Sequence, residues 1–497
     1  MVLCLYNSAP AEYLAEPIKS RSALERVVAY AGELSVAGVA IEAVRLYSTV
    51  ELRGVPEEWV VERGPELDES GLIEFLVRCG GAETDEYLVA QADQPFLNAE
   101  LTARLVRRHR EYLAQYTFAD GYPHGLAPEL VARSAIAHLR SLAGDAPVTR
   151  AGLFPIVQKD INRLDVETEL SAVDQRLLRL ELAVNTRGNL LLCQRLAEDA
   201  PTAIDEWPAH VEARRLAHRT RPAFVSVQIV EQEVHRLAYS PYPTMRDDVL
   251  APGRIMERAR FESLVHEVKR FAPEAVVQVS LWGEASLHPE LRALVDAVLD
   301  SPSLSLLVET SGVGWSDADR AHLFAIDDPR LMVIVGLDTI SPELYARIRG
   351  AGFEEAVRFA EEAVGALGGR AWVQAVRSEL TEPELDAFFR HWREKTSNVI
   401  IQKYDHFSGR LPQRKIGDIS PLRRFPCWHL QRDLYVAVDG RVPLCREDIA
   451  GEHVLGNVFT DGIESVWAAA AGHFADHVEG RYRSICEACD EYYTYTF

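Results

Sequence analysis

Four of the seven cysteines lie close together near the end of the chain. They are Cys427, Cys445, Cys486 and Cys489. The last two form a Cys-x-x-Cys sequence, which presents two thiolates from one tight turn. Four thiolates suit a tetrahedral zinc ion and an iron–sulfur cluster equally well. The spacing therefore predicts one metal site in this region and leaves the choice between these two occupants open.

The segment between the first two of these cysteines predicts a hairpin. Residues 434–438 alternate in the manner of a strand, Asp439-Gly440 follows, and a second short run leads to Cys445. Asp-Gly between two such runs is a strong hairpin signal. We expect this hairpin to bring Cys427 and Cys445 toward each other.

The cellular compartment decides whether these cysteines are expected to bind metal or to form disulfides. Residues 1–8 read as a first strand, without the basic start and apolar stretch of a signal peptide. We therefore expect a cytoplasmic protein, in which clustered cysteines stay reduced and indicate metal before disulfide. The isolated Cys4, Cys79 and Cys193 are typical of small buried core residues.

Composition limits the classes of partner. The chain has 497 residues, 47% of them hydrophobic, and a formal net charge of -22. This surface repels nucleic acid and anionic lipid, so neither is an expected partner. No run of 18 apolar residues predicts a membrane span. An unidentified small molecule or a protein redox partner is the remaining expectation.

The chain divides by pattern into three expected domains, all of the α/β class. Residues 1–205 alternate short strands with helices and predict a mainly parallel sheet. Residues 222–410 contain six strand–helix units, which indicate a full or partial (β/α)6 barrel. The strands of that barrel are expected at 224–229, 276–281, 305–309, 331–337, 371–375 and 399–404. Residues 411–497 form the cysteine-rich third region.

The third region resembles a SPASM domain. The resemblance runs in order through Phe425-Pro426-Cys427, Asp439-Gly440, Cys445, Leu455-Gly456-Asn457 and Cys486-Glu-Ala-Cys489. SPASM domains extend radical SAM enzymes and bind auxiliary [4Fe–4S] clusters. The resemblance, which is nearest to the spirochaete "spiro-SPASM" type, implies one such cluster on the four cysteines and favours iron–sulfur over zinc.

The middle region resembles a radical SAM barrel. Residues 280–290, containing Trp282-Gly283-Glu284, are similar to the Gly-Gly-Glu-Pro strand end of that family. In the family this strand end contacts the amino group of S-adenosylmethionine, so the resemblance implies a pocket of that type at Gly283 and Glu284. Gly336-Leu337-Asp338 resembles a later strand end and adds Asp338 to the same expected pocket.

The first strand of the barrel departs from that family. A radical SAM enzyme carries C-x-x-x-C-x-x-C there, but the three ligand positions in this chain are Glu233, Leu237 and Ser240. Leucine cannot ligate iron, and the oxygen donors of Glu and Ser match a thiolate-preferring cluster poorly. We expect no radical chemistry at this position, although S-adenosylmethionine or another ligand remains a possible occupant of the pocket.

The N-terminal region resembles a GT-A nucleotidyltransferase of the cytidylyltransferase kind. Residues 92–97 are similar to a Gly-Asp-Gln-Pro segment whose aspartate holds Mg²⁺, which makes Asp93 a candidate ligand. The loop that should cradle a triphosphate has no glycine before Lys19, and Asn185 and Asn189 stand where the family has aspartates. We expect the fold to be kept and transferase activity to be lost or altered.

Three functions compete on this evidence, and no catalytic residue can be named. The first is an iron–sulfur protein of radical SAM descent without radical catalysis. The second is an active enzyme, either a sugar nucleotidyltransferase or an atypical S-adenosylmethionine-dependent enzyme acting on surface glycans or small molecules. The third is a structural or interaction protein stabilised by zinc.

Overall fold

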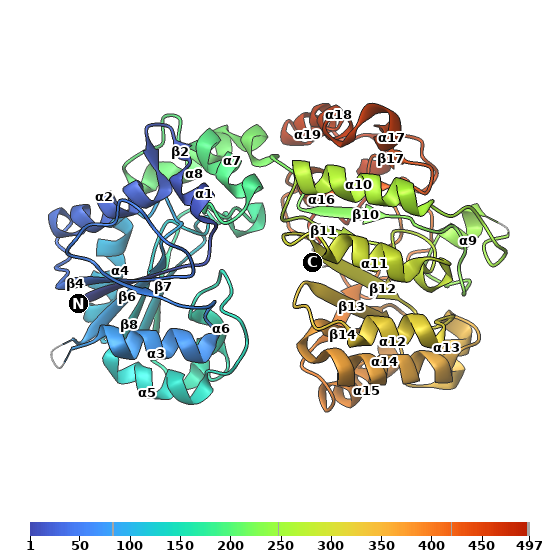
Figure 1. Ribbon diagram of the computed structural model, residues 1–497, viewed down its shortest axis with the longest axis horizontal. Helices are drawn as coiled ribbons and strands as arrows, with labels where there is room; N and C mark the ends of the chain where they lie inside the picture. The colour runs from blue at the N-terminus through green and yellow to red at the C-terminus, as the bar shows by residue number, and fades with distance from the viewer. Residues whose placement is uncertain (82–83, 247, 419, 495–497) are drawn as a thin grey trace. The chain divides into compact units, whose positions relative to one another are not determined.

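The computed structural model describes residues 1–81, 84–246, 248–418 and 420–494. It divides into two compact units, Met1–Thr220 and Arg221–Phe497 (Figure 1). The second unit contains both the predicted barrel and the cysteine-rich region. Within the described ranges, no helix is long and apolar enough to cross a membrane.

The first unit is built on a seven-stranded sheet of order β5-β4-β1-β6-β8-β7-β9. Strand β8 is antiparallel to both of its neighbours, and all other pairs are parallel. Its strands are β1 (Val2–Asn7), β4 (Ala43–Ser48), β5 (Val60–Arg63), β6 (Glu86–Gln91), β7 (Tyr116–Asp120), β8 (Glu129–Ala132) and β9 (Val166–Leu170), with the small pair β2 (Pro17–Ile18) and β3 (Arg21–Ser22) outside the sheet.

Helices flank this sheet, and their ends are set by ordinary capping chemistry. The side chain of Ser22 accepts from the N–H of Glu25 and the Glu25 carboxylate accepts from the N–H of Ser22, which forms a capping box at the start of α2. The helices are α1 (Ala11–Ala15), α2 (Ala23–Val36), α3 (Glu69–Cys79), α4 (Ala99–Glu111), α5 (Arg133–Leu142), α6 (Phe154–Gln158), α7 (Arg187–Leu196) and α8 (Trp207–Ala213).

The second unit contains a seven-stranded sheet of order β15-β14-β13-β12-β11-β10-β16, in which every pair is parallel. All six predicted strands form. They are β10 (Phe224–Val227), β11 (Val276–Gln278), β12 (Ser305–Thr310), β13 (Leu331–Gly336), β14 (Ala371–Arg377) and β15 (Val399–Lys403). A mixed α/β architecture with parallel sheets is thereby confirmed.

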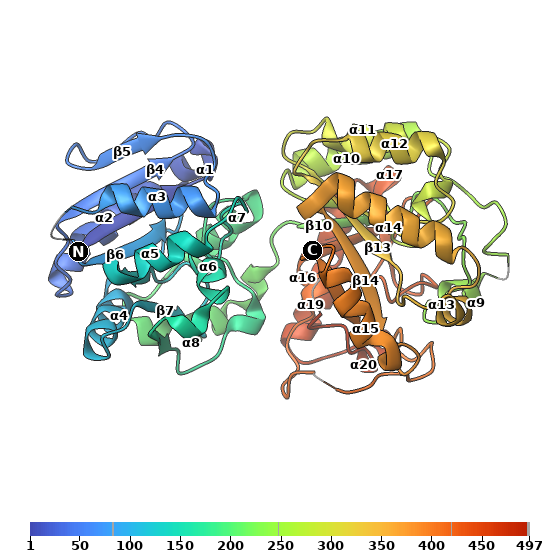
Figure 2. The ribbon, with the colours of Figure 1, turned by 90° about the horizontal axis from the view of Figure 1, so that it is seen from below.

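The crossover helices cover one face of this sheet (Figure 2). Because side chains alternate along a strand, one set of positions packs against these helices and the other set faces away from them. These helices are α10 (Arg258–Phe271), α11 (Leu291–Leu299), α12 (Asp317–Ala325), α14 (Phe353–Leu367) and α15 (Glu382–Arg393), and the short helices α9 (Tyr242–Met245) and α13 (Pro342–Ile348) lie in the connections after β10 and β13. The apolar core includes Val277, Val308, Val335 and Val373.

The other face of the sheet carries a row of polar residues across neighbouring strands. The hydroxyl of Ser226 donates to Oε1 of Gln278 at 2.5 Å. Nε2 of Gln278 and Nε2 of Gln374 donate to the two carboxylate oxygens of Glu309 at 3.0 and 3.1 Å. Toward the carboxyl ends of its strands this face therefore carries a hydrogen-bonded polar row, whereas Phe224, Leu307 and Ile334 form an apolar cluster elsewhere on the same face.

The predicted hairpin after residue 433 is wrong in its strand pairing. β16 (Asp433–Val436) joins the large sheet in parallel beside β10, and β17 (Arg441–Pro443) pairs with β18 (Val454–Asn457) instead. The Asp-Gly turn itself is present: Gly440 has φ +86°, and the N–H of Ala437 donates to the carbonyl of Arg441 at 2.8 Å. The alternating residues belong to a buried strand of a parallel sheet. The period of the alternation alone does not distinguish such a strand from a strand of a hairpin.

Short helices complete the cysteine-rich region. They are α16 (Trp428–Arg432), α17 (Val458–Asp461), α18 (Ile463–Ala469), α19 (Ala471–Val478) and α20 (Ser484–Glu487).

Candidate metal centre and strand-end pocket

The four clustered cysteines line one cavity. Cys427 precedes α16, Cys445 follows β17, Cys486 lies in α20, and Cys489 lies just beyond that helix. All four are free thiols. Much of the remaining wall is apolar and includes Leu430, Leu444, Ile485 and Tyr492. The structure thus brings together the residues that the sequence grouped, although the hairpin expected to do this does not form.

Backbone contacts hold the cysteine loops in place. The N–H of Cys489 donates to the carbonyl of Cys486 at 3.3 Å, which closes the Cys-x-x-Cys turn. Nη2 of Arg424 donates to the same carbonyl at 2.5 Å, and its guanidinium lies over the ring of Tyr482. The N–H of Cys427 donates to Nδ1 of His477 at 3.4 Å. Three separate segments therefore fix the cavity.

The electrostatics of the cavity suit a bound cationic centre. Burial raises the pKa of Cys427 to about 12, and burial, reinforced by Glu447, raises the pKa of Cys445 and Cys489 well above the ordinary thiol value. Without metal these groups are neutral thiols. A metal that displaces their protons supplies the positive charge that an apolar cavity needs to hold thiolates. The donor set therefore fits an iron–sulfur cluster or zinc.

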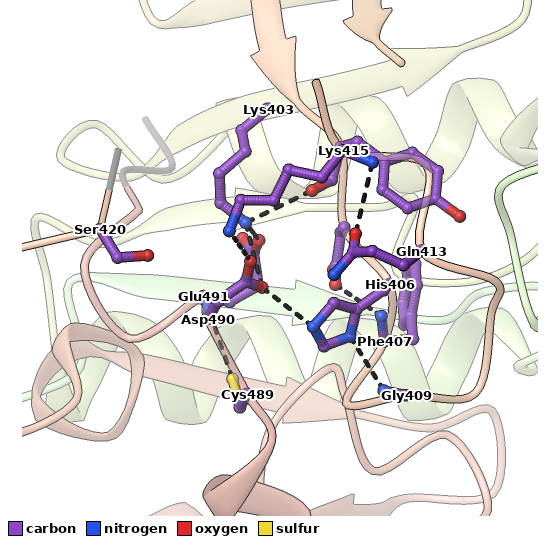
Figure 3. Close-up of polar contacts among 12 residues, drawn as sticks. Lys403, His406, Phe407, Gly409, Gln413, Lys415, Ser420, Cys489, Asp490 and Glu491 are labelled. Carbon is purple, nitrogen blue, oxygen red and sulfur yellow. Dashed lines mark hydrogen bonds and ion pairs between the residues drawn. The ribbon is translucent and has the colours of Figure 1, made fainter. Parts of the chain in front are cut away.

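A shell of charged residues adjoins Cys489 (Figure 3). The N–H of Glu491 donates to Sγ of Cys489 at 3.3 Å. Lys403 contacts the Glu491 carboxylate and lies 3.1 Å from Oδ1 of Asp490, and Lys415 lies 2.7 Å from Oδ2 of Asp490. The segment that follows Cys489 is thereby anchored on β15 and on the loop after it.

The carboxylates of this shell converge. One oxygen each from Asp405, Asp490 and Glu491 lies within 4.8 Å of the others. Nη2 of Arg446 lies 2.6 Å from Oδ2 of Asp405, so the arginine and Lys403 provide counter-charge. Sequence reasoning missed this group because Asp405 is far in the chain from Asp490 and Glu491, the acidic pair next to Cys489.

A second cavity, of about 230 Å³, opens at the carboxyl ends of the strands in the second unit. Its walls include Glu233, Leu237 and Ser240, together with Glu309 from the polar face of the sheet. The three residues that replace the expected cluster cysteines therefore do converge on one pocket, but they offer two oxygen groups and a hydrocarbon in place of three thiols.

Glu233 is tied to the Gly283 strand end. Its Oε1 accepts from the N–H of Gly283 at 2.9 Å. Burial, with a further contribution from the charge of Glu284, raises the pKa of Glu233 to about 8. Gly283 has φ +89°, and a Cβ placed there would lie 2.0 Å from the carbonyl oxygen of Val230, so only glycine fits.

The predicted pocket residues differ in their availability. Glu284 lines the pocket, but its carboxylate accepts from the hydroxyl of Thr310 at 2.6 Å and from both the N–H and the hydroxyl of Ser311 at 2.9 and 2.7 Å. Burial raises the pKa of Glu284. Asp338 is not part of the pocket wall: Nε of Arg349 lies 2.7 Å from its Oδ2, and it also contacts Tyr239. The structure brings Gly283 and Glu284 together and places Asp338 apart.

In the first unit, Asp93 is fully buried against Arg150. Nη1 and Nη2 of Arg150 donate to the two carboxylate oxygens at 2.9 Å each. Nδ2 of Asn189 donates to Oδ1 of Asn185 at 2.9 Å, so these amides pair with each other. A cavity of about 460 Å³ lies nearby, with Arg150 and Gln94 but not Asp93 in its wall. The bidentate ion pair engages both carboxylate oxygens, and the positive charge of Arg150 opposes a Mg²⁺ ion beside them.

Comparison with known families identifies the cysteine-rich region. Residues 427–490 match SPASM, described as an iron–sulfur cluster-binding domain. The match spans all four clustered cysteines. The chain therefore carries a SPASM domain.

Relatives and solved structures extend the comparison. An uncharacterized protein of Treponema pallidum (strain Nichols) is 34% identical over 360 residues, which cover 69% of this chain and 98% of the relative. A second uncharacterized protein of that organism is 44% identical over 68 residues, 14% of this chain and 31% of the relative.

Among solved structures, BtrN in complex with AdoMet and 2-DOIA is 15% identical, with TM-score 0.40 over 54% of this chain and 93% of that one. SuiB of Streptococcus suis is 12% identical, with TM-score 0.44, and the match covers 60% of this chain and 79% of SuiB.

Proposed function

Because the chain belongs to the same family as the Treponema pallidum protein that it covers almost completely, and carries a SPASM domain, we propose that it is an iron–sulfur protein with one [4Fe–4S] cluster. The observation that carries the proposal is the meeting of Cys427, Cys445, Cys486 and Cys489 in one largely apolar cavity inside the matched region. Such a cluster supplies one-electron chemistry when bound.

We also propose that the protein performs no radical SAM catalysis, and the strand-end pocket supports this. Glu233, Leu237 and Ser240 line this pocket and provide no thiolate. The Glu284 carboxylate already accepts three hydrogen bonds from Thr310 and Ser311. The proposed ligand of the pocket is S-adenosylmethionine or another small molecule. The proposed partner of the cluster is a redox protein of the cytoplasm, which accepts an electron from the reduced cluster.

We propose for the first unit a nucleotidyltransferase-like fold without transferase activity. Its support is the Asp93–Arg150 ion pair, which engages both carboxylate oxygens of Asp93 and places a positive charge where it opposes Mg²⁺. Turnover of CTP with any sugar acid would contradict this part of the proposal and favour an active enzyme of surface-glycan synthesis.

The experiment that tests the main proposal is metal and sulfide analysis of protein purified without oxygen. The expected result is about four iron and four sulfide per chain, with broad thiolate-to-iron absorbance. One zinc per colourless chain would replace the proposal by the zinc-stabilised alternative. In the same preparation we expect no reductive cleavage of S-adenosylmethionine, and formation of 5′-deoxyadenosine at enzymatic rates would overturn the loss of radical chemistry.

A further inference from the structure

The strand-end pocket and the cysteine cavity share a wall. Arg446, the residue directly after Cys445, lines both cavities. Lys403 at the end of β15 and Asp405 just beyond it line the pocket side. We call Lys403, Asp405 and Arg446 the shared wall.

The shared wall is bonded to the loop that carries Cys489. Lys403 contacts the carboxylate of Glu491, and Nη2 of Arg446 lies 3.4 Å from Oε2 of the same residue. The backbone N–H of Glu491 in turn donates to Sγ of Cys489. A chain of direct contacts therefore runs from side chains at the pocket surface to one sulfur of the cysteine site (Figure 3).

The wall also connects to the pocket floor. The charge of Arg446 acts on Glu309, whose pKa burial raises and the arginine lowers. Glu309 itself is hydrogen-bonded to two neutral amides, those of Gln278 and Gln374. Charges separated by protein and not by bulk water interact strongly and are poorly screened by salt. A charge that enters the pocket is therefore felt on the far side of the wall.

We propose that Lys403, Asp405 and Arg446 couple the strand-end pocket to the cluster, so that the charge of a pocket ligand sets the cluster's reduction potential. An anionic ligand makes addition of an electron harder and lowers the potential, and a cationic ligand raises it. The proposal rests on the proposed cluster and adds a regulatory role for the pocket: the cluster reports which ligand class is bound.

The test places a fixed charge in the pocket by substitution. Gln402 lines the pocket from β15, and Gln402→Glu adds a negative charge at nearly constant volume. Gln402→Met is its uncharged control. Ser240→Asp and Ser240→Asn repeat the comparison from the opposite segment of the wall. The readout is the midpoint potential from a redox titration followed by electron paramagnetic resonance, in protein of equal iron content.

The expected result is a lower potential for each charged variant than for its uncharged control, with at least a threefold change in the oxidised-to-reduced ratio at fixed potential. That ratio corresponds to ~28 mV for a one-electron couple at 59 mV per decade. Lys403→Met, which removes a wall cation, is expected to shift the potential in the same direction, whereas Lys395→Met, in the exposed turn after α15, is expected to leave it unchanged.

Equal potentials for both charged variants and their controls would overturn the coupling while leaving the cluster assignment intact. Absence of iron and sulfide from the unmodified protein would instead remove the proposed function on which the coupling rests. Loss of the cluster from Gln402→Glu and Ser240→Asp, with retention in Gln402→Met and Ser240→Asn, would support coupling of pocket charge to the cysteine site.

Discussion

The second unit contains two cavities lined by the residues that sequence motifs linked to clusters, and their donor sets differ. The cysteine cavity gathers four sulfur donors from segments spread over more than sixty residues. The strand-end pocket gathers Glu233, Leu237 and Ser240 from a single loop and provides no sulfur. The donor set therefore separates a cavity that fits a cluster from one that does not.

That difference shows that the order of a pocket and the chemistry of its donors are separate properties. At the pocket, Gly283 still takes the left-handed conformation needed for close approach to Val230. The polar row of Ser226, Gln278, Glu309 and Gln374 remains fully hydrogen-bonded. The protein therefore maintains this pocket as an ordered polar cavity without the three thiols, as expected if it binds something other than a cluster.

Removal of one cysteine from the metal site is expected to have the largest effect. Cys445→Ala or Cys489→Ala leaves three thiolates, and iron content should fall well below about four per chain because one iron loses the thiolate that this site supplies and the cluster becomes labile. The loss of a metal that binds only the folded state also lowers the melting temperature.

Cys193→Ala is the matched control. Cys193 is buried in the first unit and donates to the carbonyl of Ala183, so its removal costs packing but no iron. Full iron occupancy in Cys445→Ala would show that this residue is not a ligand.

The reverse change should convert the pocket into a second site. Glu233→Cys, Leu237→Cys and Ser240→Cys together place three thiols on one cavity wall, enough for a [4Fe–4S] cluster with one open iron. Iron per chain is expected to rise from about four to about eight after anaerobic reconstitution. The double variant lacking Leu237→Cys should stay near four, and a triple variant that also stays there would mean that the loop no longer permits cluster geometry.

Substitution of Gly283 tests whether the pocket backbone is held in a strained conformation. Gly283→Ala combines the cost of a positive φ with a clash against the Val230 carbonyl, and should cost about 3 kcal/mol of unfolding free energy or more. Gly350→Ala is the control, because φ there is +105° but no atom lies within 4 Å of the added Cβ.

The control should cost only about 1–2 kcal/mol. Denaturant titration measures both values. Equal losses for the two variants would show that the close approach to Val230 contributes nothing.

The sequence was informative wherever local pattern and local chemistry coincide. The six barrel strands and the four metal-site cysteines follow from alternation, strand–helix rhythm and residue type, and the structure contains both. Long-range pairing was not predictable: residues 433–436 join a sheet whose nearest strand, β10, lies about two hundred positions earlier. Propensity carries no information about such a partner.

Side-chain ion pairs were hidden for the same reason. Asp93 meets Arg150, and Lys403 meets Glu491, across 57 and 88 positions of sequence. Asp338 resembled a pocket residue by its place after a strand, yet Arg349 holds its carboxylate outside the pocket wall. The motif correctly placed Asp338 at a strand end. The direction of its side chain depends on Arg349, which is not part of the motif.

The last expected effect concerns the pH dependence of stability, which reports whether Glu233 in the strand-end pocket is protonated in the folded protein. The pKa of Glu233 is about 8 in the folded protein, above the ordinary value of 4.5, so its stabilising contribution is complete below about pH 4.5 and is lost as pH rises through 8. Between pH 5 and 8 the folded state holds a proton that the unfolded chain releases, and stability should fall by at most about 1.4 kcal/mol per pH unit from this group.

Glu233→Gln keeps an acceptor for the Gly283 N–H and removes the titration, so its unfolding midpoint should fall less steeply with pH than that of the unmodified protein. Glu394→Gln, at the exposed end of α15, is the control and should keep the original slope. The transition to follow is the one accompanied by bleaching of the visible absorbance, because it reports unfolding around the cysteine site. Parallel pH profiles for Glu233→Gln and the unmodified protein would show that Glu233 is ionised in the fold, and the pocket would then hold a carboxylate where the resemblance to radical SAM barrels places a thiolate.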